Sequence, residues 1–69
     1  MASVKHAIGE HDFIKLLDGV GEWPAGTAGT VVSDHGDSKL IEISDDRGVM
    51  LDLIEVAEDR LRLIVKYGN

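Results

Sequence analysis

The 69-residue sequence contains no cysteine, so neither disulfide bonds nor thiolate metal sites can stabilise its fold. It has one proline and three aromatic residues, and its apolar runs are far shorter than a membrane-spanning helix. The first nine residues lack the apolar segment that a signal peptide requires. Stability must therefore come from aliphatic side chains in one small core, and we expect a cytoplasmic protein that does not enter a membrane.

Basic residues are also scarce. The chain has 7 Lys and Arg against 13 Asp and Glu, which gives a formal net charge of −6. The basic residues are spread singly, apart from Arg60 and Arg62. An acidic chain repels phosphate backbones, so nucleic-acid binding is disfavoured and a partner protein with a basic surface is favoured.

Short alternating aliphatic segments, separated by turn residues, predict an all-β chain. A loop rich in glycine, with one proline, follows the first segment at residues 19–26, and glycine-centred turns lie at 34–38 and 45–48. A single 3₁₀ turn is expected at residues 57–60. The predicted strands cover residues 11–18, 30–34, 39–44, 49–56 and 61–65.

This order predicts a small five-stranded SH3-like barrel with a long first loop and a one-turn 3₁₀ helix before the last strand. The barrel would span residues 10–65, between a flexible N-terminal extension (1–9) and a C-terminal tail (66–69). In the fourth strand, Leu51 and Leu53 alternate with Asp52, and we expect the two leucines to face the core. The predicted core is Ile14, Leu16, Val31, Ile41, Ile43, Leu51, Leu53, Leu61 and Leu63.

The stretch Gly26–Val32 (GTAGTVV) resembles the loop-to-strand element of KOW-type and other SH3-like barrels. Together with HDFIKLLD, LIEIS, DDRGVMLDL and AEDRLRLI, it makes residues 10–64 similar to a family of small bacterial SH3-like domains of unknown function. Some members of that family are encoded beside toxin-like genes, so the resemblance implies an interaction, antitoxin or immunity-type role. The KOW likeness implies an alternative, an RNA- or ribosome-associated domain.

Nothing in the sequence predicts catalysis, a cofactor or a metal. The serines and threonines stand in no nucleophile-elbow or triad-like context, and side chains fill the interior of so small a barrel. His6, His11 and His35 lack the paired spacing of metal ligands, so we expect them to be surface residues.

The candidate partner-binding residues are a loop tryptophan with its following proline and a set of carboxylates on turns and polar strand positions. The tryptophan could cover one end of the core as a lid or stand exposed as an anchor. The carboxylates could be a solubilising face or a surface for a basic protein, and self-association as a homodimer through an exposed strand is a further alternative. These residues are Trp23, Pro24, Asp34, Asp37, Glu42, Asp45, Asp46 and Asp52.

Overall fold

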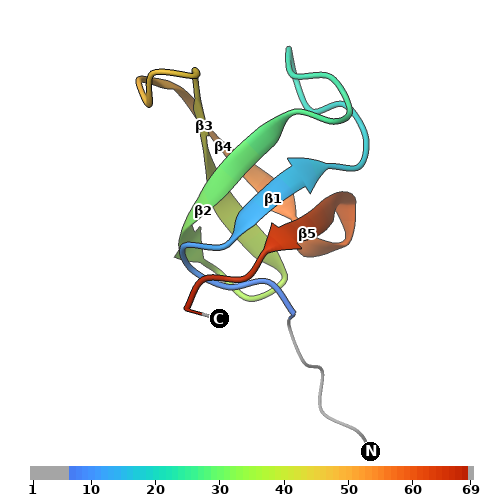
Figure 1. Ribbon diagram of the computed structural model, residues 1–69. Helices are drawn as coiled ribbons and strands as arrows, with labels where there is room; N and C mark the ends of the chain where they lie inside the picture. The colour runs from blue at the N-terminus through green and yellow to red at the C-terminus, as the bar shows by residue number, and fades with distance from the viewer. Residues whose placement is uncertain (1–6, 69) are drawn as a thin grey trace, which may run out of the picture.

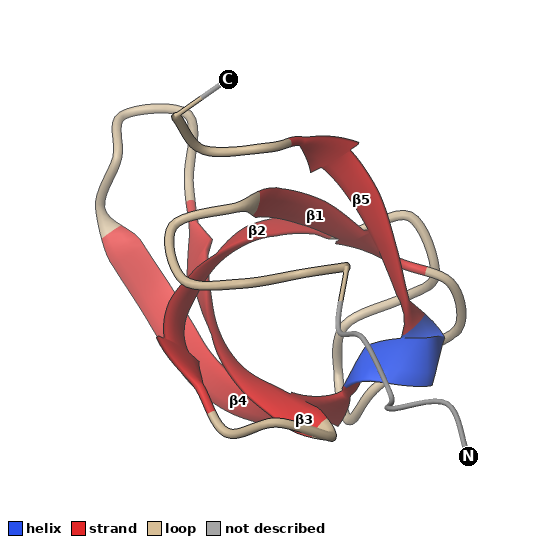
Figure 2. Ribbon diagram, turned by 90° about the horizontal axis from the view of Figure 1, so that it is seen from below, coloured by secondary structure: helices blue, strands red, loops and turns tan. Residues whose placement is uncertain are grey.

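Five antiparallel strands form one curved sheet with the order β4-β3-β2-β1-β5, as Figure 1 and Figure 2 show. The structure is a computed structural model and describes residues 7–68. This all-β architecture confirms the predicted fold class, including the single 3₁₀ turn before the last strand. The elements are β1 (Phe13–Leu16), β2 (Ala28–Asp34), β3 (Ser38–Ser44), β4 (Met50–Ala57), η1 (Glu58–Arg60) and β5 (Leu61–Val65).

The curvature of the sheet has a local cause in three unpaired strand residues. Val32, Leu51 and Ile64 each lie where the pairing register shifts by one, so each is a β-bulge. A bulge bends its strand and increases its twist, which lets a five-stranded sheet curl around a core. Strand β1 is shorter than predicted at both ends; near its start, His11 adopts a positive φ of 74°, which is not a strand conformation.

The inner face of the curled sheet carries the core. Most of the predicted core residues are buried there, and Leu63 packs against them partly buried. Ile8 also belongs to the core, although the sequence placed it in the N-terminal extension; residues 1–6 lie outside the described residues. The buried aliphatic residues are Ile8, Ile14, Leu16, Val31, Ile41, Ile43, Val56 and Leu61.

The prediction that Leu51 and Leu53 face the core is wrong. They are 53% and 45% exposed, because Ile54 lies opposite the buried Ile41 and the inward positions of β4 are therefore Asp52, Ile54 and Val56. Nearly every position of this strand is apolar, so alternation alone did not determine which face it buries. The polar residue that seemed to mark the solvent face points inward instead.

Both ends of the described chain meet at a buried carboxylate. Asp12 is 1% exposed, and its oxygens accept hydrogen bonds from Gly9 N (2.8 Å), Lys66 Nζ (2.7 Å) and Tyr67 N (2.8 Å). Burial alone would raise the pKa of Asp12, but these bonds and the Lys66 charge outweigh it and lower the pKa below its ordinary value of 3.8. The start of the predicted C-terminal tail is therefore bonded to the barrel.

No helix within residues 7–68 is long and apolar enough to cross a membrane.

Asp12→Asn should lower the free energy of unfolding by about 1–3 kcal/mol near neutral pH, because charged hydrogen bonds to a buried group are lost. The folded pKa of Asp12 lies below the unfolded value, so its stabilisation is complete above about pH 4 and disappears as the pH falls through the folded pKa. The difference between wild type and variant, measured by urea unfolding, should therefore shrink as the pH falls below about 4. The exposed Glu10→Gln serves as control, and a pH-independent difference for Asp12→Asn would contradict this account.

Candidate protein-binding surface

The outer face of the sheet carries one row of side chains that crosses all five strands. The pairing registers join Val65 to Phe13, Phe13 to Thr30, Thr30 to Glu42 and Glu42 to Leu53. Paired residues on antiparallel strands project from the same face. Each of these five side chains therefore lies beside the next one across the sheet. The three apolar members are all exposed, with Val65 at 58%.

A groove of about 260 Å³ opens at the middle of this row, between β2 and the end of β3. The two strands are held close at Gly29, where a Cβ atom would lie 2.6 Å from Ile41 Cγ2 and 2.9 Å from the Glu42 carbonyl oxygen. Beyond that point Ala28 pairs only with β1 and Ser44 only with β4, so the strands separate. In Figure 1 the turn between β3 and β4 accordingly stands apart from β2. The groove is lined by Phe13, Ala28, Gly29, Thr30, Glu42, Ser44, Asp45 and Asp46.

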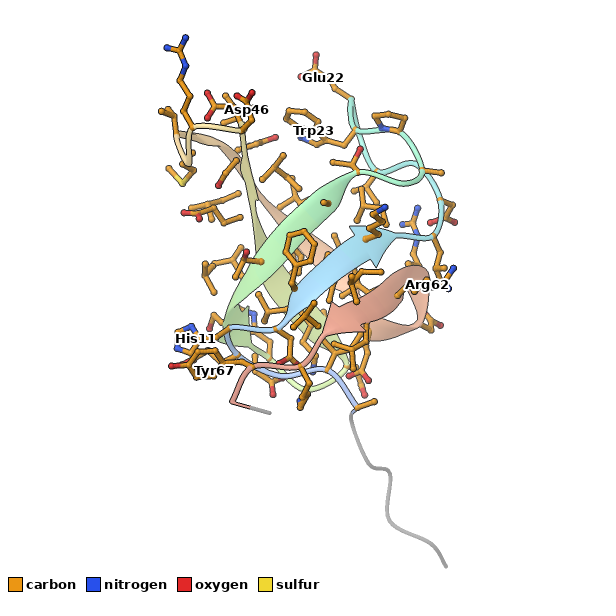
Figure 3. All side chains as sticks on the ribbon, in the orientation of Figure 1. His11, Glu22, Trp23, Asp46, Arg62 and Tyr67 are labelled. Atoms are coloured by element: carbon orange, nitrogen blue, oxygen red, sulfur yellow. The ribbon has the colours of Figure 1, made fainter. Side chains whose placement is uncertain are left out.

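Three of the predicted carboxylates, Glu42, Asp45 and Asp46, lie together along this groove. Asp45 Oδ1 accepts hydrogen bonds from Arg47 N and Val49 N (2.9 Å each), which fixes the turn, and Asp46 lies exposed on the same turn (Figure 3). None of the three forms an ion pair with a cation of residues 7–68. The groove therefore combines an apolar wall at Phe13 with a negative rim.

The tryptophan of the long loop closes one end of the core. Trp23 is partly buried against the core, and its backbone exchanges two hydrogen bonds of 2.9 Å with Val20. Its indole Nε1 donates to Asp52 Oδ2 at 2.8 Å, which ties the loop to β4. This agrees with the lid interpretation and leaves the exposed Pro24 as the outermost of the two predicted loop residues. Asp52 is thus engaged inside the molecule rather than on an acidic surface.

The remaining predicted carboxylates belong to the β2–β3 turn. Asp34 Oδ1 accepts a hydrogen bond from Lys39 Nζ (2.5 Å), and the fully buried Lys39 also pairs with Glu58 (3.0 Å). Burial lowers the pKa of Lys39, but the two carboxylates outweigh it and hold the pKa above its ordinary value of 10.5. Asp34 therefore stabilises a buried cation, while Asp37 is exposed on the turn and lies off the groove.

A hydrogen-bonded serine–histidine–glutamate chain, which the sequence did not reveal, joins the same turn to β4. Ser33 Oγ lies 2.9 Å from His35 Nε2, and His35 Nδ1 lies 2.8 Å from Glu55 Oε2. The Glu55 pKa is lowered, first by a hydrogen bond from Ser38 and then by that with His35.

This connectivity is that of an acyl-transfer triad, but the surroundings are not. The side chains of His35 and Glu55 are 47% and 44% exposed. The amides of His35 and Gly36 already donate to Ser38 O and Asp34 Oδ1, so neither can stabilise an oxyanion. The chain of bonds fixes the turn against β4.

No group of three or more His, Cys, Asp or Glu within the described residues could hold a metal ion. His6 lies outside those residues.

Searches of protein-family models, of curated proteins and of solved structures found no match to this chain.

The bond between Trp23 and Asp52 can be measured by a double-mutant cycle. Trp23→Phe keeps most of the ring and removes the donor, and Asp52→Ala removes the acceptor. We expect the two effects on the free energy of unfolding to be coupled by about 1–2 kcal/mol, because the acceptor is charged. Additive effects on the free energy of unfolding would show that the stabilisation by Trp23 does not depend on Asp52.

Proposed function

We propose that this protein is a non-enzymatic interaction module that binds the basic surface of another protein through the outer face of its sheet. The observation that carries the proposal is the row Val65–Phe13–Thr30–Glu42–Leu53, with the groove at its centre. Three of its five side chains, Phe13, Val65 and Leu53, are apolar and exposed, and exposed apolar side chains bordered by polar ones are a feature of binding surfaces. The groove offers a wall for the stem of a long side chain and carboxylates for its charge.

Charge favours a basic partner in two ways. The net charge of −6 attracts a basic protein at long range, and the three groove carboxylates lack a cation among residues 7–68. An arginine or lysine of the partner would supply a cation for these carboxylates. An antitoxin or immunity-type role against a neighbouring gene product is the most concrete form of this proposal, and it rests on the family resemblance alone.

The test uses a short synthetic peptide of alternating leucine and arginine, titrated into isotopically labelled protein and followed by backbone amide shifts. We expect shifts at Phe13, Thr30 and Glu42, and affinity that falls as NaCl rises from about 50 to about 500 mM. Glu42→Gln with Asp46→Asn should weaken binding by about tenfold or more.

The control variant, Glu22→Gln with Asp59→Asn, makes the same change in net charge at exposed positions outside the groove. An equal loss of peptide affinity in both double variants would refute the groove as the site. So would a leucine–glutamine peptide that binds as tightly as the leucine–arginine peptide. Tighter binding of an RNA oligonucleotide would favour the KOW-like alternative. Hydrolysis of p-nitrophenyl acetate that disappears in Ser33→Ala would refute the non-enzymatic assignment.

A further inference from the structure

The longest strand of the sheet also presents a group of uncovered apolar side chains. Met50, Leu51 and Leu53 of β4 are 52%, 53% and 45% exposed, and Val49 precedes them at 56%. They lie on a hairpin whose turn stands apart from β2 (Figure 1). A contiguous uncovered apolar group of this kind marks a surface that is covered in a complex.

Edge-to-edge pairing of β4 with another strand is blocked. β4 is one of the two edge strands of the sheet, but Leu51 is a bulge that interrupts its ladder. Asp52 Oδ1 also accepts a hydrogen bond from Leu53 N (2.9 Å), which occupies that backbone donor. Bulges and occupied donors are how natural proteins protect an edge strand, so the apolar group must be covered through its side-chain face.

We propose that this face binds a second copy of the chain, with two β4 strands crossing antiparallel about a twofold axis at Met50. Arg47 lies on the turn that precedes β4, so a twofold axis at Met50 directs the turn of each copy toward the Leu53 end of the other copy's β4. Leu53 is the register partner of Glu42, which lines the groove, so this arrangement brings Arg47 of one copy toward Glu42 of the other.

Charge complementarity is what selects a second copy. Arg47 is exposed, and its guanidinium makes no hydrogen bond or ion pair within residues 7–68. The same surface therefore carries a cation and carboxylates that lack ion pairs, and an isologous interface brings each cation to a carboxylate of the other copy twice, once on each side of the axis. The apolar side chains between them supply the contact, and the two ion pairs fix the register.

The interface shares Glu42 and Leu53 with the surface proposed for a basic partner. Self-association and partner binding are therefore mutually exclusive, and the dimer is a reservoir from which a basic partner releases the monomer. The dimer interface is formed by β4 and Arg47, and its formation does not depend on the basic partner.

Sedimentation equilibrium over about 5 to 500 µM protein tests the proposal. We expect the mass to rise toward twice the 7.5 kDa of the chain. Leu51→Ser with Leu53→Ser should weaken the dimer by about a hundredfold. The control, Leu17→Ser with Ile64→Ser, replaces similarly exposed side chains elsewhere (54% and 41%) and should leave it intact.

Charge reversal tests the register. Arg47→Glu should weaken the dimer by about tenfold, and adding Glu42→Lys should restore it by exchanging the two charges across the axis. A monomeric wild type, equal effects of the two serine pairs, or no recovery in the exchanged variant would each overturn the proposal. A monomeric wild type would leave the peptide titration unaffected, so the two proposals fail separately.

Discussion

The structure depends on which face of β4 is turned toward the core. Ile54 opposite Ile41, and Val56 opposite the buried Lys39, place the even-numbered residues of this strand beyond its bulge, Asp52, Ile54 and Val56, inside. Asp52, the third inward residue, would be costly there without a partner, and the indole of Trp23 supplies a hydrogen bond. The register of β4 against β3 thus also places Asp52 where it can hold the long loop, through Trp23, at the end of the core.

The same choice creates the surface on which function is proposed. With Ile54 and Val56 inside, Leu51 and Leu53 must lie outside, on the face that also presents Phe13 and Val65. Gly29 permits the close approach of β2 to β3 at the end of their ladder, beyond which the two strands separate. The groove and its carboxylates are a consequence of that separation.

Much of the fold could be predicted from the sequence because its turns are marked by glycine and aspartate and its last strand by a compact run of aliphatic residues. Gly48, for example, adopts the positive φ of 83° that the sequence implied. Which face of β4 is buried could not be predicted, since most of its positions are apolar. Only the long-range pairing with Ile41 determines which of its two faces lies against the core. A tryptophan in a glycine-rich loop left the lid and the exposed-anchor interpretations open and did not identify its hydrogen-bond acceptor.

The candidate surface was predicted in part. Glu42, Asp45 and Asp46 do lie together, whereas Asp34 pairs with the buried Lys39, a charge that sequence patterns place in solvent. Phe13 precedes the predicted core residue Ile14, yet its alignment with Val65 and Leu53 depends on four separate registers. In the Ser33–His35–Glu55 chain the glutamate lies 20 residues beyond the histidine, so no local spacing could reveal the whole chain.

The most direct test of this account measures which methyl groups of β4 face solvent. A soluble paramagnetic agent, added to methyl-labelled protein at a concentration where the chain is monomeric, relaxes exposed methyl groups far more strongly than buried ones. The account predicts strong relaxation for Leu51 and Leu53, weaker relaxation for Ile54 and the least for Val56. Protected leucines beside strongly relaxed Ile54 and Val56 methyl groups would contradict it.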